Sequence, residues 1–148
     1  MAKCKSVLPL DLINEMKKLE EKTPEMIDEM LNAGADGVMQ RIKEHAPTQI
    51  ARNSKIMSRL GKTVVYNTSK DNALNIKVAF WGYYKGKVPF YSRGSKYEQT
   101  PIPLIVALFE YGRSDSPFPK HPFVRKSFAK NSVEADMLKI QEKYLPKE

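Results

Sequence analysis

Residues that could carry acid–base, nucleophilic or metal chemistry are few in this chain of 148 residues. It has two histidines, His45 and His121, and one cysteine, Cys4. Zinc sites use several ligands at short fixed spacings, and the sequence has no HxxxH or HExxH motif and no cysteine cluster. Cys4 has no neighbour in sequence that would hold an activating base in place. The sequence therefore predicts no metal, no cofactor and no enzymatic activity.

Glu110 is the charged residue in the most unusual setting, because it stands between two aromatic residues at the end of an apolar run. Burying a carboxylate is costly unless it is paired, and the nearest candidate partners in sequence are Arg113 and Arg125. The alternative is a carboxylate that is half-exposed at the end of a strand or helix. An acid–base pair between Glu110 and His121 is the least favoured interpretation.

A turn and an extended segment are predicted directly after this carboxylate. Gly112 permits a backbone conformation that a residue with a Cβ would resist. Pro117, Pro119 and Pro122 each fix their own φ and disfavour helix in the preceding residue, which predicts an extended path. Residues 123–128 then have the character of the first turns of a helix, with Pro122 at or near its start.

Two blocks of this region resemble a known family. The block FEYGR at residues 109–113 and the block PKHPFVRKSF at residues 119–128 are similar to motifs of the tail-component family of long-tailed bacteriophages. The family pattern also has a helix that ends in Ala-Pro, which fits Ala46-Pro47, whereas residues 48–51 lack the glycine that usually follows. The residues of the two blocks that we expect to serve structure or assembly are Glu110, Tyr111, Gly112, Arg113, Pro119, Pro122, Phe123 and Arg125.

The resemblance implies a structural protein of the neck, the head–tail joining region, which acts in tail completion or as a minor tail component. Such a protein would form a ring of copies of itself, alone or only on the tail, and would contact neighbouring neck and tail proteins. A ring requires head-to-tail contacts between two different surfaces of each copy. The protein would be found in the virion, with DNA passing nearby, and in the host cytoplasm during assembly.

The charge of the chain allows a second function. The formal net charge is +8, spread along the sequence without a run of five or six like charges. Residues 85–100 are predicted to form a long basic loop, where Tyr91, Arg93, Lys96 and Tyr97 combine cations with aromatic rings. Loops of this length are usually functional or disordered, so we expect partner contact here. The same residues would suit a small basic nucleic-acid-binding protein of a mobile element, or the lysines only solvate a surface.

Two consecutive helices are predicted in the first third of the chain. The N-terminal segment 1–22 contains a short helix that begins near residue 10. Its apolar stripe consists of Leu12, Met16 and Leu19. Thr23 is a suitable N-cap and Pro24 suits the first helical position, so these residues predict the start of a second helix that runs to about residue 46.

The second helix carries two glycines, Gly34 and Gly37, in its interior. Each costs ~1 kcal/mol relative to alanine, so a compensating contact is expected. We expect the close approach of another backbone, from a sheet that crosses beneath the helix. The alternative is a break at Asp36-Gly37, which is less favoured because the apolar stripe stays in phase across the glycines.

A β-hairpin is predicted in the middle of the chain. Residues 62–67 are rich in β-branched and aromatic side chains, and residues 74–81 alternate between apolar and polar. The second strand is expected to continue through Tyr84, with a further short strand at residues 88–91. Turn-forming residues between the first two strands indicate that they pair with each other.

The last third of the chain is predicted to be mainly helical. Residues 101–109 suit either a buried strand or a short helix, and the resemblance favours the helix. A final helix is expected over residues 132–144 with Ser132 as its cap. Together these elements predict a single α+β domain over residues 1–148: a small, mainly antiparallel sheet of about four strands, a long helix packed across it and a C-terminal helix. No apolar run is long enough for a signal peptide or a membrane span.

Overall fold

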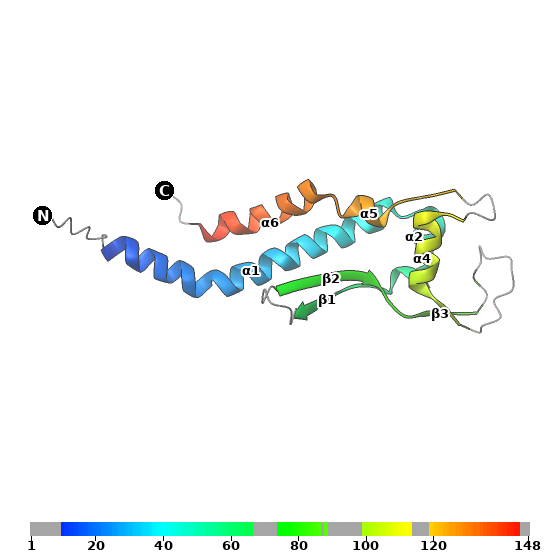
Figure 1. Cartoon of the computed structure of the whole chain (residues 1–148), viewed down its shortest axis with the longest axis horizontal. Coiled ribbons are helices and arrows are strands. Elements are labelled where there is room, and N and C mark those ends of the chain that lie inside the picture. The colour runs from blue at the N-terminus through cyan, green and yellow to red at the C-terminus, as the bar shows by residue number, and fades with distance from the viewer. Residues whose placement is uncertain (1–9, 67–73, 87, 89–98, 114–118, 146–148) are drawn as a thin grey trace, which may run out of the picture.

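The structure is a computed structural model that describes residues 10–66, 74–86, 88, 99–113 and 119–145 (Figure 1). Over the described residues, three helices come first, four strands follow, and three helices end the chain, in an α+β arrangement as the sequence predicts. In chain order the elements are α1 (Leu10–His45), α2 (Thr48–Ala51), α3 (Ser54–Met57), β1 (Leu60–Tyr66), β2 (Leu74–Phe80), β3 (Tyr83–Lys85), β4 (Gln99–Pro101), α4 (Ile102–Tyr111), α5 (Val124–Ser127) and α6 (Lys130–Tyr144).

The long helix α1 is continuous over 36 residues, so the prediction of two separate helices is wrong. Thr23 does not cap a new helix, because its Oγ1 donates a hydrogen bond to the carbonyl of Leu19, one turn earlier, at 2.7 Å. Pro24 lies inside the helix, where it lacks the N–H that would bond the carbonyl of Glu20. The ribbon of α1 changes direction between its dark-blue first half and its cyan second half, as expected near an internal proline (Figure 1).

The helix continues through its two glycines, and the predicted continuity is confirmed. The element that approaches them is α6, not a sheet, so that part of the prediction is wrong. A Cβ at Gly34 would lie 3.3 Å from Cγ of Met137, and a Cβ at Gly37 would overlap the carboxylate of Asp136. The glycines therefore give α6 room to pack closely against α1.

The predicted hairpin is confirmed: β1 and β2 pair antiparallel, with Leu60 opposite Phe80 and Tyr66 opposite Leu74. The four strands form two separate two-stranded sheets and not one sheet of four. At Gly82 the backbone has a φ of 88°, so the chain leaves the direction of β2 before it enters β3. β3 then pairs antiparallel with β4. The predicted short strand at 88–91 lies outside the described residues, except for Val88.

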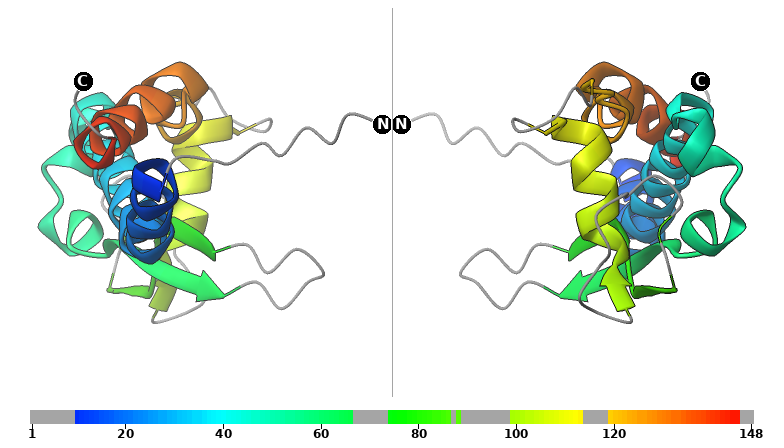
Figure 2. Two further views of the ribbon diagram at one scale, coloured as in Figure 1. Left: turned by 90° about the vertical axis from the view of Figure 1, so that its left-hand side faces the viewer. Right: turned by 90° about the vertical axis from the view of Figure 1, so that its right-hand side faces the viewer.

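The hydrophobic core lies where the second half of α1 meets the hairpin, α4 and the short helices. Viewed along its axis, α1 runs through the middle of the molecule, with α6, α4, the strands and α2 around it (Figure 2). The rings of Phe80 and Phe123 meet edge to face with centroids 6.4 Å apart. The buried apolar side chains that form this core cluster are Val38, Ile42, Ile50, Ile56, Leu60, Phe80, Tyr84, Val88, Ile102, Ile105, Val106, Phe109 and Phe123.

Helix α6 begins at Lys130 and not at Ser132, so the predicted cap is wrong. Ala129 occupies the N-cap position, and the N–H of Ser132 already donates to the carbonyl of Ala129 at 3.1 Å. Val133, Met137, Ile140 and Tyr144 form a half-buried stripe along α6, and Val133 and Met137 face Gly34 of α1. Partial burial and the nearby carboxylate of Glu29 raise the pKa of Tyr144. The last turn of α6 therefore lies beside Glu29 of α1.

Candidate assembly site

Glu110 is buried at the end of α4 and organises the corner between α4 and α5. Only 3% of the residue is exposed. Its Oε2 accepts hydrogen bonds from the backbone N–H groups of Phe123, at 2.8 Å, and Val124, at 3.0 Å. Its Oε1 accepts the backbone N–H of Arg125 at 3.2 Å and the side-chain Nε of Arg125 at 2.9 Å.

This geometry decides between the alternatives for Glu110. The carboxylate pairs with Arg125 and is not half-exposed at the end of a helix. It also binds the N–H groups that a helix leaves without intrahelical partners at its N-terminus, so a side chain of α4 caps α5. Because four donors occupy its two oxygens, this carboxylate is poorly placed to act as a general base.

The electrostatic balance at Glu110 keeps the carboxylate charged. Burial by itself raises the pKa of the group, because a charge is disfavoured away from water. Hydrogen bonds from the backbone of Val124, the side chain and backbone of Arg125 and the backbone of Phe123 outweigh burial and hold the pKa below its usual value of 4.5. The ionised form is therefore the one that holds the corner together.

Gly112 makes the turn after α4. Its φ of 72° and ψ of −172° lie in a region that only glycine adopts readily. Its N–H donates to the carbonyl of Leu108 at 2.9 Å, which ends the helix. The chain then returns along the helix end, where the N–H of His121 donates to the carbonyl of Phe109 at 2.8 Å. Residues 119–123 lie outside helices and strands, as the prolines predict.

The corner is tied to α1 through Ser127 and Arg41. The buried Ser127 donates its Oγ–H to the carbonyl of Phe123 at 2.7 Å, and its own carbonyl accepts Nε of Arg41 at 3.1 Å. The Nη1 of Arg41 forms an ion pair with Asp136 of α6 at 2.8 Å. Arg41 thus joins three helices. Sequence reasoning missed it, although its position two turns after Gly34 on the glycine-bearing side of α1 was an available signal.

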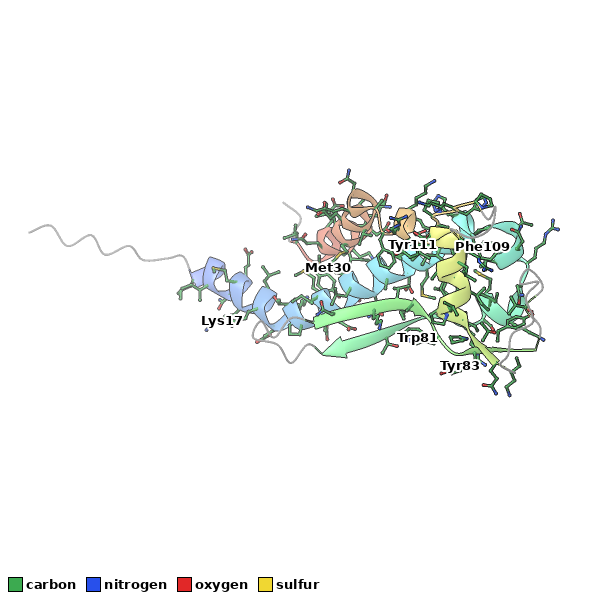
Figure 3. The ribbon with its side chains drawn as sticks, turned by 45° about the vertical axis from the view of Figure 1, so that its right-hand side comes forward. Lys17, Met30, Trp81, Tyr83, Phe109 and Tyr111 are labelled. Atoms are coloured by element: carbon green, nitrogen blue, oxygen red, sulfur yellow. The ribbon has the colours of Figure 1, made fainter. Side chains whose placement is uncertain are left out.

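The outer surface of the corner combines an aromatic ring with a cation. Tyr111 is 58% exposed, and the guanidinium of Arg125 lies 5.1 Å from the centroid of its ring. Figure 3 shows Tyr111 at the same end of α4 as Phe109, which is buried in the core. Arg113, directly after the turn, is half-buried, and Pro119 is exposed. The corner therefore combines a hydrogen-bonded interior with the exposed side chains of Tyr111, Pro119 and Arg125.

The second predicted contact region cannot be placed in the same way. Tyr91, Arg93, Lys96 and Tyr97 lie outside the described residues. Of the predicted basic loop at 85–100, Lys85 is exposed at the end of β3, and residues 99–100 form part of β4. Its role in partner contact stays a prediction.

No group of three or more His, Cys, Asp or Glu side chains in the described part of the chain is arranged to hold a metal ion. His45, the last residue of α1, is exposed, and its Nδ1 lies 3.5 Å from Oγ of Ser127. None of the described helices is both long and apolar enough to cross a membrane.

Residues 11–82 match the model of the protein family described as "Bacteriophage HK97-gp10, putative tail-component". This confirms the resemblance to a phage tail-component family. The match begins in α1 and ends at the glycine after β2. The two blocks at 109–113 and 119–128 lie outside the matched residues, so their likeness to family motifs stays a prediction. No curated protein and no solved structure gives a match.

Proposed function

We propose that this protein is a structural component of the phage head–tail junction, where copies of it assemble into a ring in tail completion or head–tail joining. The observation that carries the proposal is the match of residues 11–82 to a family of phage tail components. Such a protein acts in the virion, and its partners are further copies of itself and the neighbouring neck and tail proteins. It is made in the host cytoplasm before it joins the particle.

The structure has two different surfaces through which one copy could contact two neighbouring copies. Inside the α4–α5 corner, Glu110 meets the N–H donors of α5, so the corner keeps its shape without a partner. Outside it, Tyr111 and Arg125 are exposed. The first turns of α1 lie at the other end of the molecule (Figure 1). A ring with head-to-tail contacts needs two such different surfaces on each copy.

The test is deletion of the gene from the phage or prophage that encodes it, followed by electron microscopy of the lysate. We expect filled heads that lie apart from tails, or tails of irregular length. A plasmid copy of the wild-type gene should restore joined particles, whereas a copy with Glu110→Ala should not. Normal virions from the deletion strain would overturn the proposal.

A second candidate function, nucleic-acid binding, rests on the cationic surface of α2 and α3. Arg52, Lys55 and Arg59 are exposed there, and the stretch of residues 48–62 contains no acid. Lys55 also lies 5.5 Å from the ring centroid of Tyr84. Backbone phosphate contact makes affinity fall steeply with salt.

DNA titrations across salt concentrations test this second candidate. If duplex phosphates are bound, the double variant Arg52→Ala, Arg59→Ala should flatten the dependence of log affinity on log salt by ~0.9 for each contact removed. Lys139→Ala, on the exposed side of α6, is the matched control and should leave the slope unchanged. A shallow slope that neither variant changes would exclude phosphate recognition by this surface.

A further inference from the structure

The first turns of α1 form a projecting helix with exposed apolar side chains. Residues 10–22, here called the arm, extend beyond the other described elements (Figure 1). Leu10 is 76% exposed, Met16 60% and Leu19 37%. Short helices are marginal in water by themselves, and most helical stability in proteins comes from packing of an apolar face. The arm therefore has a face suited to packing and no element of the described chain to pack on it.

The exposed stripe of the arm continues the side of α1 that α6 covers further along. Met16 and Gly34 are 18 residues apart, which is about five helical turns, so they lie on the same side of the helix. At Gly34 that side is covered by Val133 and Met137 of α6. α6 ends at Tyr144, next to Glu29, so the same side is left open over the arm.

A second apolar helix face that no described element covers lies on α4. Leu104 is 53% exposed and Tyr111 58%, and Leu108 between them is half-buried. Their spacing of four and three residues places them on one side of the helix. The other side, with Ile105 and Phe109, is buried in the core. A short helix that is apolar on both sides is typical of an element with a second packing partner.

The two faces carry opposite charge around them. Residues 10–32 contain seven carboxylates and three lysines. Residues 99–113 and 119–129 contain four arginines or lysines and a single acid, Glu110, whose carboxylate is buried and bonded. The acidic segment begins at one end of the molecule and the basic segments lie at the other (Figure 1). Opposite charges steer an acidic helix toward a basic surface.

We propose that the arm of one copy packs on the α4 face of a second copy, so that copies join head to tail. The apolar side of the arm, with Met16 and Leu19, meets Leu104, Leu108 and Tyr111, and exposed acids such as Glu15 and Glu20 face the basic rim. The inference rests on the proposed function, because it names the contact from which the ring is built. Pairing of two arms fits less well, since it brings acidic segments together and leaves the α4 face bare.

A contact of a few helical turns is smaller than the roughly 800 Å² per partner of a typical stable interface. A single contact of this kind is therefore weak. In a closed ring every copy makes the contact twice, once through its arm and once through α4. When the ring closes, the last contact forms between two copies that are already held in the same assembly. The effective concentration of these two surfaces is therefore high, and the ring is more stable than the single contact. If the rotation between copies closes, this gain favours rings over isolated pairs.

Disulfide cross-linking of the full-length chain tests the pairing. Leu19→Cys and Leu104→Cys are made separately in a Cys4→Ser background, mixed, and oxidised with copper phenanthroline in air. Leu138→Cys is the matched control for the acceptor, because Leu138 on α6 is as exposed as Leu104, at 53% each. The products are separated on a non-reducing gel and identified by mass spectrometry.

We expect the mixed 19–104 disulfide to exceed the mixed 19–138 disulfide at least several-fold, and its yield to fall with added salt. A chain that carries both Leu19→Cys and Leu104→Cys should give a ladder of cross-linked multiples. Three results would overturn the inference: equal yields for the two acceptors, no disulfide above background, or a predominant 19–19 dimer, which would indicate arm–arm pairing. The deletion experiment judges the role in the particle separately, so a failure of either proposal is recognised by itself.

Discussion

The α4–α5 corner and the arm of α1 are both parts of one chain, and they are stabilised in different ways. In the corner, the carboxylate of Glu110 satisfies three backbone N–H groups and Arg125, and Ser127 and Arg41 fasten α5 to α1. In the arm, every residue from 14 to 22 is exposed, and the helix has few contacts beyond its own backbone. The corner is held by hydrogen bonds between its own elements, whereas the described residues supply no comparable support for the arm.

The corner should be the more sensitive of the two regions to loss of a carboxylate. Glu110→Ala leaves buried N–H donors and a guanidinium without their acceptor, so we expect the free energy of unfolding to fall by ~3–5 kcal/mol. Glu20→Ala, on the exposed arm, should change it by less than ~0.5 kcal/mol. Urea denaturation followed by circular dichroism measures both. Equal effects of the two variants would remove the distinction between the regions.

Acid should weaken the corner through protonation of Glu110. The pKa of Glu110 is held below its usual value, so the unfolded chain takes up a proton at a higher pH than the folded chain. Its stabilising contribution is complete above about pH 4.5 and is lost as the pH falls through the lower, folded-state pKa. Denaturation midpoints measured from pH 7 down to pH 3 should therefore decrease, and Glu110→Gln should decrease less steeply. An unchanged slope in that variant would assign the acid sensitivity to other groups.

Features of the fold that depend on neighbouring residues could be predicted from the sequence, whereas features that depend on distant packing could not. The hairpin follows from alternation within each strand, and the turn and extended segment of the corner follow from Gly112 and the prolines; both signals are local. That Glu110 would cap α5 could not be predicted in this way. The choice of Arg125 over Arg113 depends on how the chain returns after Gly112, which sequence distance does not reveal. The identity of the element beneath Gly34 depends on packing against α6, about a hundred residues away in the sequence. Periodicity predicts that a face is covered and not what covers it.

The break predicted at Thr23 failed for a related reason. Threonine and proline are both frequent at the start of a helix. The hydroxyl of Thr23 can instead donate a hydrogen bond to a carbonyl of the preceding turn, as it does here. A proline then costs one hydrogen bond and some strain without ending the helix. The arm itself was visible in the sequence as a narrow apolar stripe, whereas the sequence did not reveal that none of the described elements covers it.

The turn that leads from α4 to α5 should be the next most sensitive point. Gly112→Ala places a Cβ in a conformation that is almost restricted to glycine, so we expect a loss of ~1–3 kcal/mol in the free energy of unfolding. Thermal or urea denaturation measures this loss. Wild-type stability in this variant would mean that the turn can relax without moving Glu110.

The two helix glycines offer a finer test of how closely α6 packs. Both Gly34→Ala and Gly37→Ala gain ~1 kcal/mol of helix propensity. At Gly34 the new methyl meets the flexible side chain of Met137, so we expect unchanged or slightly higher stability. At Gly37 it displaces Asp136 from its ion pair with Arg41, so we expect a net loss of ~1 kcal/mol. Equal changes in thermal denaturation for the two variants would contradict this packing.

The arm should show the smallest effect on stability. Leu19→Ser should change the free energy of unfolding by less than ~0.5 kcal/mol, because Leu19 is already exposed in the single chain, whereas Ile42→Ala in the core should cost ~2–5 kcal/mol. Limited trypsin digestion of dilute protein should cut after Lys17, Lys18 or Lys22 before it cuts after Arg41, which is half-buried in the packed part of α1. If the core were cut as early as the arm, the two regions would not differ in local stability.

The proline inside α1 gives the molecule a mechanical property. Because Pro24 cannot donate to the carbonyl of Glu20, one turn of the helix resists bending less than the turns on either side. The arm can therefore swing as a stiff lever about this turn while the packed body keeps its shape. In a circular arrangement of copies, bending at Pro24 would allow small changes in the diameter of the ring or in the tilt of its subunits.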